Sequence, residues 1–220
     1  MRGDGRGFWE NVGGAFQILW ALLTPFLRRR RERWGAFDTE LARSWAGDDL
    51  VPRPRWQYLN GITVDAPAAG VWPWVAQIGQ GRGGFYSFER LENLTGCRIR
   101  NADRILPEHQ ALSPGEGIRL AEKTPPLPVA LVDPGRALVV YGGDVRGESA
   151  DEAGQVSVTW GFYVEGVDQG RCRLLSRYRV DHGPGVAPAL FYGPWLVGPI
   201  ACVMQRKMLW GIKLRAEQHH

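Results

Sequence analysis

The chain has 220 residues, of which 44% are hydrophobic and 23% charged, so it can bury a substantial core and suits one domain with an extension. Five arginines and one glutamate in residues 28–33 (RRRRER) carry +4, which equals the formal net charge, so the remaining charges balance. This localised charge argues against a uniformly basic nucleic-acid binder. Three cysteines without a CxxC pair suggest neither a disulfide framework nor a zinc site, and they fit a reducing cytoplasm.

The first 55 residues differ from the rest. An apolar run at residues 8–27 contains polar interruptions, and Pro25 ends or kinks it, so it is a weak candidate for a spanning helix, which needs about 20 apolar residues. The arginines follow the run, unlike those of a signal peptide. Three interpretations stay open: the run lies in the membrane interface, spans marginally, or packs on its own domain or another subunit. The first predicts membrane contacts at Trp20, Arg28, Arg29 and Arg30.

Residues 34–51 contain a short helical pattern, and Pro52 and Pro54 then mark a linker. We therefore expect an N-terminal helical extension over residues 1–55 and a ligand-binding domain over residues 56–220. Within the domain, the pattern predicts a strand at 57–64 and helices at 66–77 and 88–94. A short strand at 117–121 and a hairpin of 127–132 with 137–141 follow, around a turn containing Pro134 and Gly135.

The clearest strand pair is 156–167 with 171–180. Its second strand alternates arginines with apolar residues, which predicts one covered face and one solvated outer face. The arginines of the expected solvated face are Arg171, Arg173, Arg177 and Arg179. A long helix at 189–218 follows, with an apolar stripe and a kink or break expected at Gly198-Pro199.

The stretch from residue 65 to 93, DAPAAGVWPWVAQIGQGRGGFYSFERLEN, resembles an uncharacterised bacterial branch of the SRPBCC superfamily, the START-like and polyketide cyclase-like proteins. The tail QRKMLWGIKLRAE is similar to the end of the same branch. The resemblance covers residues 56–217. It implies an α+β helix-grip fold, in which a curved antiparallel sheet wraps around a long C-terminal helix and forms a cavity for an apolar ligand.

The glycine loop Gly79-Gln80-Gly81-Arg82-Gly83-Gly84 matches GxGxxG, but a helix precedes it and no βαβ unit follows, so a dinucleotide site is rejected. Arg82 is expected either to clamp an acidic ligand or to pair with Glu89 or Glu92. With the family cavity in view, we expect ligand contacts at eight positions, against a competing interpretation of ordinary packing for the aromatic ones. These are Trp74, Arg82, Phe85, Tyr86, Trp160, Tyr178, Met204 and Met208.

Besides a structural or partner-binding role through residues 8–34, two functions of different kinds are compatible with this sequence. The first is non-catalytic binding of a hydrophobic small molecule or lipid in an internal cavity, in the cytoplasm and peripherally on the inner face of the membrane. The second is a polyketide cyclase- or dehydratase-like enzyme, with Tyr86, Arg82, Tyr178 or His109 moving a proton or polarising a carbonyl. No metal is expected, because ligand-spaced His, Cys and carboxylate groups are missing. No cofactor is expected either, since the glycine loop lacks its strand, and the localised charge argues against a nucleic-acid partner.

Overall fold

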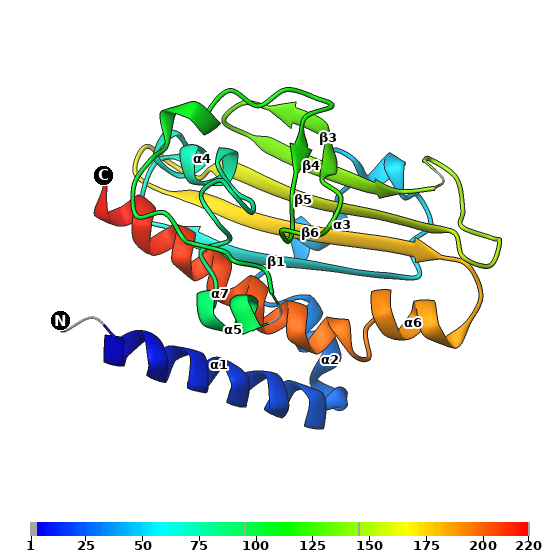
Figure 1. Ribbon diagram of the computed structural model, residues 1–220. Coiled ribbons are helices and arrows are strands. Elements are labelled where there is room, and N and C mark those ends of the chain that lie inside the picture. Colours follow the sequence, from blue (N-terminus) through cyan, green and yellow to red (C-terminus); the bar gives the residue numbers. More distant parts are fainter. Residues whose placement is uncertain (1–3, 95, 145, 220) are drawn as a thin grey trace.

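A computed structural model describes residues 4–94, 96–144 and 146–219. Its centre is a six-stranded antiparallel sheet with the order β1-β6-β5-β4-β3-β2 (Figure 1). The strands are β1 (Trp56–Val64), β2 (Gly117–Ile118), β3 (Leu127–Asp133), β4 (Ala137–Gly143), β5 (Val156–Gly166) and β6 (Cys172–His182). Each lies close to its predicted range, because alternating apolar positions fix both the strand and the face that it buries.

The concave face of the sheet is covered by helices. The C-terminal α7 (Val197–Gln218) lies along β1 and contacts α4 (Ala68–Ala76), while α5 (Glu89–Leu94) lies nearby (Figure 1). The short α6 (Val186–Tyr192) precedes α7, and a 3-10 turn, η3 (Pro107–His109), lies in the irregular connection before β2. A sheet that wraps a long C-terminal helix confirms the predicted α+β helix-grip fold.

The break in the C-terminal helical region lies earlier than predicted. α6 ends at Tyr192 and α7 starts at Val197, so Gly198 and Pro199 belong to the first turn of α7. A proline is tolerated in the first turn because the amide that it lacks has no helical partner there. The helix is interrupted at Gly193, where an added Cβ would clash with the Ala189 carbonyl oxygen.

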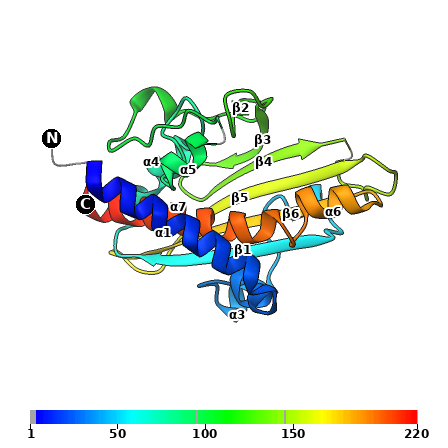
Figure 2. The same cartoon turned by 60° about the horizontal axis from the view of Figure 1, so that its bottom comes forward.

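The outer face of the sheet is covered, contrary to the prediction that its arginines are solvated. Residues 33–53, with α3 (Asp38–Ala42) and the 3-10 turn η2 (Asp48–Leu50), cross this face on the side opposite α7 (Figure 2). Glu40 accepts two hydrogen bonds from Arg173, and Asp48 accepts two from Arg177. The extension supplies the counter-charges, so the arginine row is buried instead of solvated; only Arg171, at the strand end, is exposed.

The N-terminal helix α1 (Asp4–Leu23) packs on the side of α7 that faces away from the sheet, and it also contacts α5 (Figure 2). Ala21 is buried there with Phe88 and Val203. The 3-10 turn η1 (Pro25–Leu27) and α2 (Arg28–Glu32) then lead back to β1. One face of α1 packs on the protein's own domain, as one of the three interpretations of this segment expects. The other face of α1 is exposed.

Candidate functional site

Four of the predicted ligand contacts lie in the main core: Trp74, Phe85, Tyr86 and Met208 are between 0% and 7% exposed. The Tyr86 hydroxyl donates to the Trp74 carbonyl at 3.2 Å, and the two rings meet edge to face. Burial raises the pKa of Tyr86, which keeps its hydroxyl protonated. Here these side chains contact one another, and their contacts to a ligand stay predictions.

Arg82 holds the loop between α4 and α5 together. Its guanidinium donates to the carbonyl oxygens of Ala76 and His109, both at 3.0 Å, and burial lowers its pKa. The hydrogen bonds that the structure describes for Arg82 therefore go to the main chain and not to Glu89 or Glu92, the acidic partners considered from the sequence. Met204, another predicted ligand contact, lies away from the sheet, in the cluster between α7, α1 and α5.

The other two predicted contacts are half-buried on the concave face. The ring of Tyr178 stacks on Tyr58 of the neighbouring strand at 5.4 Å, and the Trp160 indole donates to Ser176 Oγ at 3.0 Å. Burial raises the pKa of Tyr58 and of Tyr178, so both hydroxyls are neutral donors at pH 7. The concave face thus presents aromatic rings with polar groups between them.

Two polar atoms beside this face lack a hydrogen bond among the described residues. They are Oδ1 of Asn60 on β1 and Nε2 of Gln205 on α7, and both are buried. The Tyr58 hydroxyl donates to Gln205 Oε1 at 3.5 Å, which places the Gln205 amide next to the aromatic pair. Buried polar groups are nearly always satisfied, which marks this place as one where a hydroxyl or carbonyl group would be accepted.

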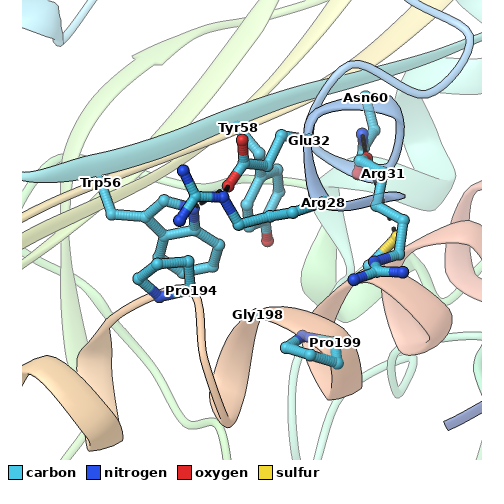
Figure 3. A pocket seen from close by; sticks show the side chains of 10 residues that line it. Arg28, Arg31, Glu32, Trp56, Tyr58, Asn60, Pro194, Gly198 and Pro199 are labelled. Atoms are coloured by element: carbon cyan, nitrogen blue, oxygen red, sulfur yellow. Dashed lines mark hydrogen bonds and ion pairs between the residues drawn. The ribbon is translucent and has the colours of Figure 1, made fainter. Parts of the chain in front are cut away.

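Helix α2 closes the gap between β1 and α7 (Figure 3). Glu32 accepts a hydrogen bond from the Trp56 indole at 2.7 Å, and the Arg31 carbonyl accepts one from Asn60 Nδ2 at 2.8 Å. Trp56 and Tyr58 line one side of the space beneath, and Pro199 of α7 lines the other. The volume left is about 10 Å³, the size of a single water site, which is too small for a ligand.

A larger apolar groove lies outside this closure, between α1, α2 and α7, with a volume of about 520 Å³. Arg31 and Cys202 line both the groove and the small space under α2, so they form the partition between the two. The groove residues are Phe16, Gln17, Trp20, Ala21, Leu27, Arg30, Arg31, Trp34, Cys202, Val203 and Arg206. Of the four predicted membrane contacts, Trp20 and Arg30 therefore lie in the groove wall.

Exposed apolar side chains lie on α1, on η1 and on the α6 segment. On α1 and η1, Trp20 is 65% and Phe26 78% exposed; on α6 and the turn after it, Phe191 is 60% and Trp195 58% exposed. The Arg28 guanidinium lies 5.2 Å from the Trp195 ring and connects the two surfaces. Among the described residues, the stretch Val186–Gln218 is long and apolar enough to cross a membrane, by length and composition only, as core helices of soluble proteins also are.

The described residues contain no cluster of His, Cys and carboxylate groups that could hold a metal ion, and Cys97, Cys172 and Cys202 form no disulfide bond. Sequence reasoning missed Tyr58, Asn60 and Gln205, although the alternation of β1 already placed the first two on the covered face. It also missed Trp34 and Arg206, whose proximity depends on how α2 and α7 meet. The sequence shows that the residues of α6 are apolar, but it does not show that their side chains are exposed.

No family model and no curated protein matches this chain. Similar solved structures include the ZhuI aromatase/cyclase of a Streptomyces species, with 17% identity, a TM-score of 0.40 and coverage of 74% of this chain and 94% of that one. The di-domain ARO/CYC BexL has 15% identity and a TM-score of 0.39, over 74% and 46% of the two chains. A hypothetical protein of Helicobacter pylori has 14% identity and a TM-score of 0.44, over 79% and 95%.

Proposed function

We propose that the protein binds a hydrophobic small molecule or lipid beside helix α7 while it rests on an anionic membrane surface. The observation that carries this proposal is the groove of about 520 Å³, which lies within the range of roughly 300–1,000 Å³ typical of ligand pockets. Trp20 of its wall is 65% exposed, and further exposed aromatic side chains lie on α1 and α6. Large exposed apolar patches mark membrane or partner sites.

The charges next to this surface favour a membrane. Arg29 and Arg30 are exposed on α2, directly after the apolar helix α1. An aromatic helix face flanked by arginines suits the boundary between acyl chains and anionic headgroups. In this arrangement the groove opens where a lipid or apolar ligand would leave the bilayer, and the partition formed by Arg31 and Cys202 separates it from the concave face.

Native mass spectrometry of the protein purified without detergent tests ligand binding. We expect an adduct of small-molecule mass that collisional activation releases, and its replacement when the protein is offered a total lipid extract. A protein that stays free of adducts before and after exposure to the extract would contradict the binding function.

A cyclase-like reaction is the second candidate, and one observation favours it. Tyr58 and Tyr178 stack beside Gln205, whose Nε2 lacks a partner among the described residues, so this nitrogen and the neutral tyrosine hydroxyls could donate to a carbonyl oxygen. If the bound compound changes in mass or in chromatographic retention during incubation and Tyr178→Phe prevents that change, the protein is an enzyme. If both mass and retention stay constant, the binding function is sufficient.

A further inference from the structure

The groove between α1, α2 and α7 is cationic at its walls. Arg30 and Arg31 on α2 and Arg206 on α7 line it, and none of its described lining residues is acidic. The closest acidic residue in sequence, Glu32, is already engaged by Arg28 at 3.3 Å and by the Trp56 indole. The positive charge of the groove is therefore not neutralised within the wall itself.

The three arginines keep donors for a ligand. One nitrogen of Arg31 donates to the carbonyl and the hydroxyl oxygens of Thr24, which orients the side chain but leaves its other N–H groups. The Arg206 guanidinium lies 4.8 Å from the centre of the Trp34 ring. This contact orients the guanidinium without using its N–H donors. Arg30 is exposed at the groove mouth.

Apart from Gln17, the remainder of the wall is apolar. Phe16, Trp20 and Leu27 line it from the N-terminal side and Val203 from α7. A ligand complementary to this wall has an apolar chain and one anionic end. A guanidinium binds a carboxylate or phosphate in two parallel hydrogen bonds, and such charge-assisted contacts are the strong ones.

We propose that this groove binds a monomeric, single-chain acidic amphiphile, with its carboxylate or phosphate on Arg30, Arg31 and Arg206 and its chain along Phe16 and Trp20. The inference rests on the proposed function and assigns the class of ligand to it. It differs from the cavity that the family resemblance implied, because the groove lies on the side of α7 away from the sheet.

Calorimetry with the full chain tests the headgroup, using laurate and dodecanol below their aggregation concentrations. We expect laurate to bind about tenfold or more tightly than dodecanol, since only laurate forms charge-assisted hydrogen bonds. The double variant Arg30→Gln/Arg206→Gln should lose this preference, while Arg104→Gln, an exposed arginine outside the groove, should keep it. If the native protein binds laurate and dodecanol equally well, the acidic-ligand inference is overturned, but the proposed binding of a hydrophobic molecule still holds. Binding of neither probe would contradict both.

A second pair of variants tests the location. Gln17→Trp places a large ring in the groove wall from an exposed position, so it should weaken laurate binding about tenfold or more, as expected when a pocket is filled. Ala15→Trp, exposed on α1 but outside the groove lining, should leave the affinity unchanged. Unchanged affinity in Gln17→Trp, or a preference that survives in the double arginine variant, would place the acid elsewhere and overturn the proposal.

Discussion

Arg173 is 6% exposed, so its guanidinium is largely removed from water, and it pairs instead with the carboxylate of Glu40, which is distant in sequence. Its Nε and one terminal nitrogen donate to Glu40 at 2.7 and 2.9 Å, and the same terminal nitrogen also donates to the Gly35 carbonyl. Removing one partner of a buried pair leaves an uncompensated charge, which costs about 3–5 kcal/mol. We expect Glu40→Ala to lower the free energy of unfolding by that amount in urea titrations.

Glu165→Ala is the matched control, because Glu165 pairs with Arg43 at the surface, where the two side chains are 40% and 45% exposed. Exposed pairs contribute about 0–1 kcal/mol. Similar losses in the two variants would mean that the extension does not bury the Arg173 charge against Glu40 in solution.

Glu92 on α5 gives a pH dependence. Burial, and then the charge of Glu89, raise its pKa to about 7. A carboxyl whose folded pKa lies above its unfolded value binds a proton more tightly in the native state, so stability should fall as pH rises from about 4.5 to about 7. Thermal unfolding at pH 5 and pH 8 should show that Glu92→Gln removes this part of the slope, worth roughly 2 kcal/mol after allowance for solvent screening.

If the native protein and Glu92→Gln lose the same stability between these pH values, the carboxyl is not perturbed. Glu122→Gln, whose carboxylate pairs with Arg98 at the surface, serves as the control and should retain the slope.

At the scale of elements, α1 is held by close contact with Phe88, the residue before α5. A Cβ added at Gly14 would lie 2.8 Å from the Phe88 ring, which is buried, whereas one at Gly13 would meet nothing within 4 Å. Alanine in place of glycine favours a helix by about 0.8–1.0 kcal/mol at either position. We expect Gly13→Ala to stabilise the protein and Gly14→Ala to loosen α1, as shown by faster proteolysis of residues 4–23.

Equal protection of α1 in the two variants would mean that this helix does not dock on Phe88. That outcome would also remove one wall of the groove.

The sequence predicted the strands within a few residues, because alternation in β5 and β6 defines both element and face. It misjudged the arginines of β6, since alternation shows that two faces differ but not that Glu40 and Asp48 come back to cover the polar one. Trp160 and Tyr178 were placed on the concave face correctly. The groove could not be predicted from the sequence, because it depends on how α1 and α2 pack on α7, and no local sequence pattern encodes that packing.

At the scale of the molecule, the N-terminal extension has two parts with different roles. Residues 33–53 complete the outer layer of the sheet through buried ion pairs, while α1 and α2 build the groove and carry exposed aromatic and cationic side chains. Deleting the extension as a whole would therefore mix loss of stability with loss of binding. Substitutions confined to exposed positions separate the two.

Fluorescence quenching by lipids with brominated acyl chains tests the central claim, that this face lies on a membrane. Trp9, Trp20 and Trp195 are 71%, 65% and 58% exposed, whereas Trp45 and Trp74 are buried. With anionic brominated vesicles we expect quenching of the native protein and its near loss in Trp9→Phe/Trp20→Phe/Trp195→Phe, because tryptophan favours the headgroup boundary. High salt should reduce it. Absent quenching, or quenching that persists in the triple variant, would contradict the account.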